Sequence, residues 1–316
     1  MSLVTEASEK KESKPSWLAT SWLILITMVV AAGATYFWLM SGQDVHDLHR
    51  LPASRVQILL AVRVLIVASV LYILAVSRLK RWIYQVGHGG DFERALRLNK
   101  TWSRLPFYGS SFEGIILFNA GRYSEARESL KPMAFDAHGA PRLATTELYA
   151  YALALENDGH EQDAQKLLEA AVPVSKNPDA MRVALATCLL AQNKEPERAC
   201  KLLEQTQGTT QGVPRADLAR RIGRYAWALG ACNRRPEAEA AIQEALAKAQ
   251  GLPDADVAGV HYFVGEAWRA LGETTKAREA FQEAVTLRPD GVTALSVEKA
   301  LAKMDGTWHA WPTQHG

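Results

Sequence analysis

The sequence predicts an all-α protein in which two transmembrane helices precede a solenoid of paired helices. Two long apolar runs lie within the first eighty residues, and these are the first observation behind this fold class. The rest of the chain is rich in alanine and leucine, and similar segments recur along it at a regular interval. Recurrence of this kind indicates supersecondary units that stack on one another.

Composition and charge exclude several classes of function. The formal net charge is only +2 over 316 residues, so no global field attracts nucleic acid. Three cysteines, Cys188, Cys200 and Cys232, are too few and too scattered for a disulfide framework or a zinc site. We expect them to be buried as small apolar residues in a reducing compartment.

The first predicted transmembrane helix covers residues 17–40. No charged residue occurs from Pro15 to Gln43, and about 20 apolar residues are enough to cross a bilayer core. Trp17 and Trp38 lie near the two ends, where aromatic rings favour the interface. A cleaved signal peptide is the alternative, but the run is long and a second apolar run follows closely.

The second predicted transmembrane helix covers residues 56–77, after a short external loop at 41–55. Arg63 interrupts its apolar run, and a guanidinium in hydrocarbon costs several kcal/mol. Either the side chain extends to the interface, or it contacts a carboxylate or carbonyl of a partner's transmembrane helix. Neither predicted span contains an acidic residue, so an ionic partner within the membrane would belong to another protein.

The basic residues around the two spans predict the orientation in the membrane. Two spans place both termini on one side. Six lysines and arginines flank the spans on that side, against two in the loop, so the N-terminal tail (residues 1–16) and the repeats are expected in the cytoplasm of a bacterial inner-membrane protein. These residues are Lys10, Lys11, Lys14, Arg78, Lys80 and Arg81, against Arg50 and Arg55.

The clearest repeat begins near residue 258 and alternates small and large residues at fixed positions. It resembles the tetratricopeptide family, which implies two antiparallel helices per unit with small residues where the helices cross. Four more copies begin near residues 107, 145, 180 and 219, giving five repeats over 107–290. The family positions in the clearest copy are Gly265, Trp268, Ala277, Phe281, Ala284 and Pro289.

The flanks of the array complete the predicted organisation. Residues 78–106 read as a connector and half-repeat whose first helix continues the second span. Residues 291–306 resemble the capping helix that closes such arrays. The tail, 307–316, contains Trp308 and Trp311, which either pack on the last repeat or serve as a docking peptide.

The resemblance also implies a binding surface, because the first helix of each unit lines a concave groove in this family. An aromatic and polar wall suits a peptide or helix ligand. The alternative is that some of these aromatic side chains pack between repeats. The predicted groove residues are Tyr108, Phe118, Asn119, Tyr149, Asn157, Gln192, Arg220, Trp227, Tyr262, Glu266 and Arg269.

No catalytic set, cofactor or metal site is expected. His46 and His49, with Asp44 and Asp47, could approach a metal ion in the loop, but no third fixed ligand is evident. No Ser/His/Asp or Cys/His arrangement can be argued, because repeats provide grooves rather than closed pockets.

The layout of two spans and cytoplasmic repeats resembles that of the HemY-type inner-membrane proteins tied to haem biosynthesis. We expect a protein-binding scaffold that acts as an assembly factor or accessory subunit of a membrane complex. A recruiter or regulator of a cytoplasmic biosynthetic pathway is the alternative, and a permanent structural subunit is a third. The expected partners are other proteins, including an integral-membrane one, and the lipid bilayer, without nucleic acid.

Overall fold

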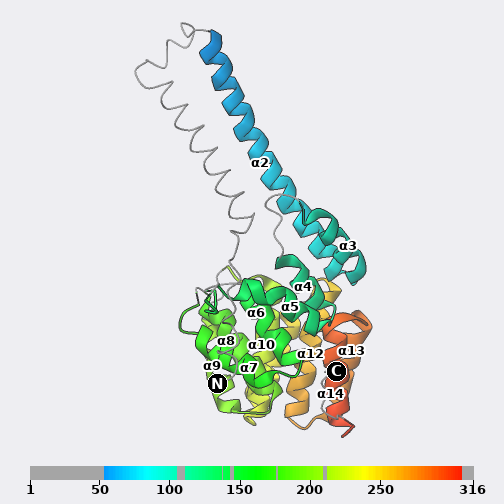
Figure 1. Ribbon diagram of the computed structural model, residues 1–316. Helices are drawn as coiled ribbons and strands as arrows, with labels where there is room; N and C mark the ends of the chain where they lie inside the picture. Colours follow the sequence, from blue (N-terminus) through cyan, green and yellow to red (C-terminus); the bar gives the residue numbers. More distant parts are fainter. Residues whose placement is uncertain are drawn as a thin grey trace, which may run out of the picture. The chain divides into compact units, whose positions relative to one another are not determined.

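The computed structural model describes residues 53–104, 111–136, 138–142, 146–175, 177–208 and 212–307. These residues form α-helices, numbered α2 to α14, that pack as consecutive pairs (Figure 1). The predicted all-α fold class is therefore confirmed. Several predictions lie outside the described residues: the tail 1–16, the span 17–40, the loop up to residue 52 with its histidines, Tyr108, and residues 308–316.

The chain divides into two compact units. The N-terminal unit contains α2 (Ala53–His88) up to Gln85, and the part of α3 (Phe92–Trp102) that begins at Arg97. One continuous helix, α2, therefore covers the second predicted span and the first helix of the predicted connector, and it ends at His88. Within the part of the chain that the structure describes, no helix combines the length and apolarity that crossing a membrane requires.

The second unit, which we call the repeat unit, comprises Val86–Leu96 and Ser111–Gly316. Its described helices form five consecutive hairpins and one further helix (Figure 1). The hairpins are α4 (Ser111–Asn119) with α5 (Tyr123–Ala134), α6 (Thr146–Asn157) with α7 (Glu161–Ala171), α8 (Pro178–Ala191) with α9 (Pro196–Gln207), α10 (Arg215–Ala231) with α11 (Arg235–Ala249), and α12 (Asp254–Ala270) with α13 (Thr274–Leu287); α14 (Gly291–Met304) follows them.

The turns within hairpins depend on residues that tolerate a left-handed backbone. Asn233 has φ 58° between α10 and α11, and Gly272 has φ 77° between α12 and α13. Asparagine and glycine are the residues that enter this region at low cost. Pro196 then begins α9, where the missing N–H of proline is tolerated because the first helical donors have no partner within the helix.

Two helices of the repeat unit begin earlier than the sequence predicts. The structure starts α10 at Arg215 and α12 at Asp254, rather than near 219 and 258. The preceding Pro214 and Pro253 are extended, with φ near −55° and ψ near 145°. Each proline therefore ends the linker, and the residues after it add a turn to the helix instead of lengthening the junction.

Small residues allow the two helices of a hairpin to cross closely. A Cβ atom at Gly265 would lie 2.5 Å from ring carbons of Phe281, and one at Gly114 would lie 2.4 Å from Leu130 Cγ. Both large side chains thus lie over the bare backbone of the facing helix. This packing is what the alternation of small and large residues predicts for helices in contact.

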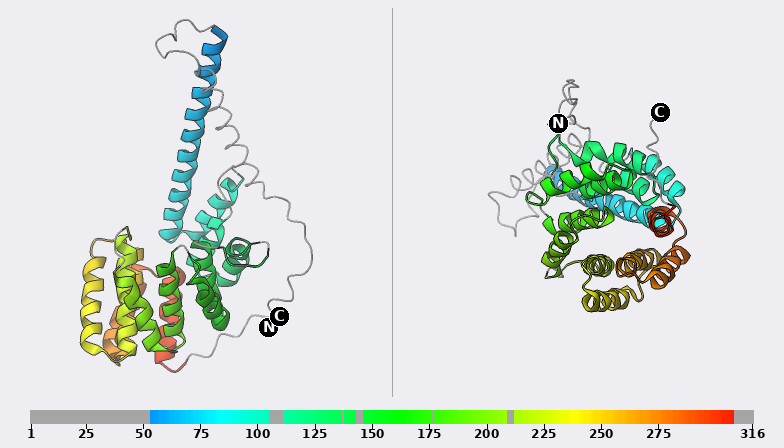
Figure 2. Two further views of the ribbon diagram at one scale, coloured as in Figure 1. Left: turned by 90° about the vertical axis from the view of Figure 1, so that its left-hand side faces the viewer. Right: turned by 90° about the horizontal axis from the view of Figure 1, so that it is seen from below.

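The repeat unit also brings its last helix against its first hairpin. Besides α12 and α13, α14 packs against α4, and Figure 2 shows how the curved succession of hairpins allows this. Gly291, with φ 72°, is so close to α4 that a Cβ atom there would lie 2.5 Å from the carbonyl oxygen of Asn119. Only glycine satisfies both the backbone angle and this close approach.

Candidate functional site: the inner wall of the repeat unit

The first helices of successive hairpins pack side by side. Contacts run from α4 to α6, α6 to α8, α8 to α10 and α10 to α12, and α14 follows α12. We call the polar surface that these helices share the inner wall; it is defined by Tyr149, Glu156, Arg220, Arg224, Tyr262, Glu266 and Arg269, with Lys299 and Lys303 from α14. Direct contacts join these helices at the inner wall: Arg220 of α10 pairs with Asp256 of α12, and Lys303 of α14 binds the Ala191 carbonyl of α8. The other members lie close enough to act on one another's charges.

The structure places Trp227 in the hydrophobic core, with 3% of its surface exposed, and not on an open groove. Its neighbours in the same face of α10 are Gly223 and Gly230. A Cβ atom at Gly223 would lie 3.0 Å from Phe263 Cβ, and one at Gly230 would lie 2.9 Å from the Ala267 carbonyl oxygen. Since both glycines draw α10 onto α12, the side chain between them is enclosed by the second helix.

Arg224 was not among the predicted groove residues, although it belongs to the inner wall. Arg224 follows Gly223 by one residue, or about 100° around the helix, and therefore lies beside the face that Gly223 packs against α12. Its guanidinium carbon lies 4.0 Å from the centroid of Phe263, and its Nε has no hydrogen-bond partner among the described residues. Burial lowers the pKa of Arg224. The prediction named Arg220 and Trp227 on this helix, and Arg224 lies one turn after Arg220.

Glu156 is the second residue that the prediction omitted. Only 7% of its surface is exposed, and Oε2 has no hydrogen-bond partner in the described part of the chain. Burial raises the pKa of Glu156 to about 7, while Lys299 and Arg224 act in the opposite direction. In the tetratricopeptide pattern the twelfth residue of a repeat is one of those that line the groove. Glu156 is the twelfth residue of the repeat that begins near residue 145, so the pattern could have identified it as a groove residue.

Arg220 connects two helices of the inner wall. Its Nη2 lies 2.5 Å from Asp217 Oδ1 in the same helix, and its Nη1 lies 2.5 Å from Asp256 Oδ1 of α12. His88 Nε2 lies 3.6 Å from that same aspartate oxygen. The imidazole and guanidinium partners lower the pKa of Asp256.

On α12, the structure brings Tyr262, Glu266 and Arg269 together as one polar stripe. Glu266 is 4% exposed, and its Oε2 accepts hydrogen bonds from Arg269 Nε at 2.9 Å and Nη2 at 2.5 Å. This ion pair, in which two donors share one carboxylate oxygen, compensates both charges where water has limited access. Burial raises the pKa of Tyr262 well above its usual value.

The remaining predicted groove residues mostly make local contacts. The Phe118 ring lies 5.9 Å from that of Tyr123, and Asn119 is the last residue of α4. The Asn157 amide donates to the Leu153 carbonyl at 2.8 Å within its own helix. Gln192 Nε2 lies 3.4 Å from the Glu161 carbonyl oxygen. Tyr149 is half-buried on α6 and contributes to the electrostatic surroundings of Arg224.

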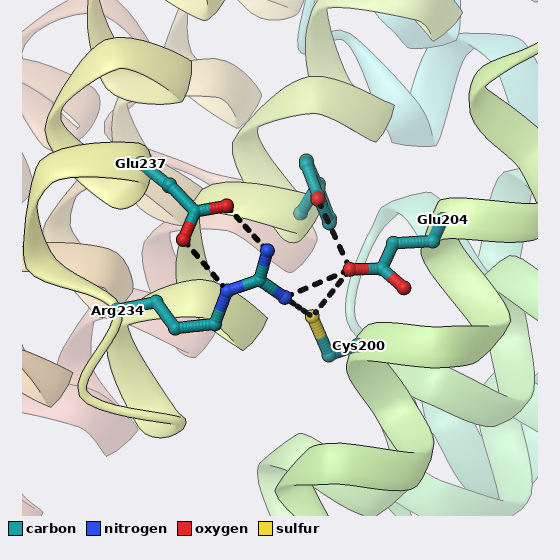
Figure 3. Close-up of polar contacts among 5 residues, drawn as sticks. Cys200, Glu204, Arg234 and Glu237 are labelled. Atoms are coloured by element: carbon teal, nitrogen blue, oxygen red, sulfur yellow. Dashed lines mark hydrogen bonds and ion pairs between the residues drawn. The ribbon is translucent and has the colours of Figure 1, made fainter.

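A separate polar cluster joins α9, the α10–α11 turn and α11. Arg234 pairs with Glu237 through Nε at 2.9 Å and through Nη2, and its Nη1 reaches Glu204 at 2.8 Å and Cys200 Sγ at 3.4 Å (Figure 3). Burial raises the pKa of the Cys200 thiol to about 12. The cluster therefore ties two hairpins together, and burial of Cys200 disfavours the thiolate that nucleophilic chemistry would need.

Among the residues that the structure covers, no group of three histidine, cysteine or carboxylate side chains could hold a metal ion. All three cysteines are free thiols; Cys188 and Cys200 are buried and Cys232 is half-buried. The predicted membrane contact, Arg63, is exposed on α2.

These observations define a protein of stacked helical hairpins with a polar inner wall. Residues 221–292, which include most of α10 and all of α11 to α13, match the family model for the tetratricopeptide repeat. The resemblance read from the sequence is therefore confirmed for this segment. A comparison with curated proteins gives no match.

Proposed function

We propose that the protein is a membrane-anchored scaffold whose repeat unit binds other proteins through the inner wall. Protein binding is supported by one observation: aromatic and charged side chains from three helices lie on one surface, among them Tyr149, Arg224 and Tyr262. Aromatic residues and arginine contribute strongly to protein interfaces. The tetratricopeptide match over residues 221–292 supports protein partners in general. The proposal assigns the protein no chemistry of its own.

The anchor is supported by the apolar surface of α2. Val64, Leu65 and Leu71 have 60%, 63% and 60% of their surface exposed. Large apolar side chains in a contiguous exposed patch mark a surface that another apolar phase covers. Together with the apolar run at 17–40 and the distribution of lysine and arginine, this favours a bacterial inner membrane with the repeat unit in the cytoplasm.

Within this proposal the protein acts as an assembly factor or accessory subunit of a membrane complex. Its membrane partner would contact Arg63, which lies inside the second apolar run. The alternative function, recruitment of soluble biosynthetic enzymes to the membrane, uses the anchor only as a tether. The two functions therefore differ in whether the sequence of the anchor matters.

An exchange of the anchor tests both. The whole protein and a variant whose residues 1–77 are replaced by an unrelated two-span anchor are purified in mild detergent, and their partners are compared by mass spectrometry. An assembly factor loses an integral-membrane partner of fixed stoichiometry in the variant. A recruiter keeps the same soluble partners in both proteins. If neither protein retains a partner at more than background level, the scaffold proposal is wrong.

A single substitution tests the role of Arg63. Arg63→Leu is expected to weaken retention of the membrane partner, whereas Arg63→Lys keeps the charge and preserves most of it. Arg78→Leu is the matched control, since Arg78 is also an exposed arginine of α2 but lies beyond the apolar run. Equal retention by all three variants would remove Arg63 from the interface.

A further inference from the structure

One helix of the inner wall, α14, lies outside the five hairpins. Its Val297 and Ala300 are buried against Phe281 and Ala284 of α13, as expected of a helix that caps the last repeat. It also packs against α12 and, at the other end of the unit, against α4. This placement leaves a second side of α14 directed toward the inner wall.

Two lysines, one turn apart, occupy that second side. Lys303 Nζ donates a hydrogen bond to the carbonyl oxygen of Ala191 at 3.2 Å. Ala191 is the last residue of α8, where the unsatisfied carbonyls of a helix carry partial negative charge and attract cations. Burial lowers the pKa of Lys303, and Glu266 acts in the opposite direction, so the ammonium lies within the field of α12.

The surface that faces these lysines contains two oxygen acceptors. Glu156 Oε2 is buried without a hydrogen-bond partner in the described residues, and a buried carboxylate in this state is costly. Both Lys299 and Lys303 stabilise its charged form. The carbonyl of Ala191 is the second acceptor. The other charges of this region are Arg224, Glu161 and the Glu266–Arg269 pair.

We infer that α14 occupies the binding site of a partner helix. The acceptors of α6, α8 and α12 bind a partner helix that carries two basic side chains one turn apart. In the free protein, Lys299 and Lys303 of α14 occupy this site. This inference rests on the proposed function, because it names the class of partner that the inner wall recognises. The partner helix also needs a small residue beside the basic pair, since Ala300 of α14 packs closely on α13.

Because α14 belongs to the same chain as the surface it covers, a partner helix must compete with it for that surface. A tethered helix acts at an effective concentration of about millimolar, so a free helix with the same contacts displaces it only weakly. Weakening the contacts of the tethered helix alone removes this disadvantage. Substitution of both lysines by glutamate does so, because it places carboxylates opposite Glu156 and the Ala191 carbonyl.

The probe is a fluorescein-labelled peptide of residues 291–305, titrated into the whole protein in detergent micelles and followed by anisotropy. The peptide is expected to bind the Lys299→Glu/Lys303→Glu protein at least about tenfold more tightly than the wild type. Alanine at both lysine positions of the peptide, or Glu156→Gln added to the variant protein, should reverse that gain. A protein with Lys201→Glu and Lys248→Glu, two exposed lysines on α9 and α11, is the charge-matched control and should behave as the wild type.

Absence of peptide binding to a variant whose helicity and melting curve equal those of the wild type would overturn the inference. So would a glutamate-substituted peptide that binds better than the lysine peptide. A second measurement does not depend on folding of the variant: excess peptide should increase hydrogen exchange at residues 291–304 of the wild-type protein while 146–157 stays protected. Unchanged exchange at 291–304 under saturating peptide also contradicts the inference.

The peptide experiment and the partner experiment separate the two proposals. Peptide binding without any co-purifying partner would support a helix-binding site at α14 and contradict the scaffold function. A purified partner retained equally by the wild-type and Lys299→Glu/Lys303→Glu proteins would support the scaffold function and contradict the helix-binding site at α14.

Discussion

Arg288 and Gly87 are in contact although 201 positions separate them: Nη2 of the arginine lies 3.3 Å from the carbonyl oxygen of the glycine. The same guanidinium donates to the carbonyl of His88 and lies 5.3 Å from the ring centroid of Phe92. One largely buried side chain therefore joins the first and last parts of the repeat unit. The carbonyls it binds belong to the end of α2, and that of Gly87 also accepts a hydrogen bond from the Gly90 N–H at 3.0 Å.

Removal of this side chain should loosen the junction. Arg288→Ala is expected to cost about 1.5–3 kcal/mol locally, because two buried acceptors lose a charged donor. Hydrogen exchange measures this best, since repeat arrays open in segments. Protection should fall at residues 86–96 and 291–304 and remain at α8 and α9. Arg198→Ala, which removes an exposed arginine with ion pairs to Glu169 and Glu195, should cost no more than about 1 kcal/mol.

The junction at Arg288 also shows which part of the fold the sequence could not predict. The hairpins are local, so the spacing of Gly265 and Phe281 predicted them directly. Whether the last helix meets the first hairpin depends on the sum of many small rotations between neighbouring hairpins. No short pattern encodes that sum, and the contact between Arg288 and Gly87 was not predicted for this reason.

The binding surface was predictable only as far as the helical register was correct. Tyr262, Glu266 and Arg269 were predicted in the register of the clearest repeat, and the structure places them together on α12. In α10 the glycines on either side of Trp227 shift the buried face, so Arg224 takes the position on the inner wall. Lys299 and Lys303 could not be found from the first helices of the repeats, since they belong to α14.

A pair of glycines in α12 tests the close packing of the last hairpin. Gly265→Ala would place a Cβ atom 2.5 Å from the Phe281 ring and should destabilise the protein by about 1–3 kcal/mol. Gly259→Ala is the control, because its Cβ atom would meet only the flexible Arg220 side chain at 3.3 Å. In that case the gain in helix propensity, about 0.5–1 kcal/mol, should make the variant neutral or slightly more stable. Chemical denaturation followed by circular dichroism compares them; equal midpoints would contradict the packing at Gly265.

The buried carboxyl of Glu156 predicts a dependence of stability on pH. Its pKa is raised from 4.5 to about 7 in the folded protein, so the folded state keeps a proton that the unfolded state releases. This contribution to stability is complete below pH 4.5 and is lost as the pH rises to about 7, by about 3 kcal/mol at most. Lys299, Lys303 and Arg224 face Glu156 and act against this rise in its pKa.

Substitution by glutamine should remove that dependence. Glu156→Gln is expected to be no less stable than the wild type at pH 5 and more stable at pH 8, because glutamine needs no proton to stay neutral. Glu244→Gln, at an exposed position of α11, should leave the pH profile of the wild type unchanged. Melting temperatures measured between pH 4.5 and 8 decide the matter, and parallel profiles for the wild type and Glu156→Gln would show that Glu156 titrates normally.

The three thiols should differ in their rate of alkylation. Burial raises the pKa of Cys188 and of Cys200 from 9.0 to about 12, and it raises the pKa of Cys232 as well. Since the thiolate is the reactive form, a pKa of about 12 lowers the reactive fraction at pH 8 roughly 1,000-fold relative to a thiol at 9.0. Cys188 and Cys200 are also shielded from an alkylating reagent, whereas Cys232 is half-buried.

Iodoacetamide should therefore modify Cys232 first in the folded protein, as read by peptide mass spectrometry. In denaturant it should modify all three thiols at similar rates. Modification of Cys200 as fast as Cys232 under native conditions would contradict this expectation. It would mean that α9 separates from the Arg234 cluster far more often than the hydrogen bonds of Arg234 to Glu204 and Glu237 imply.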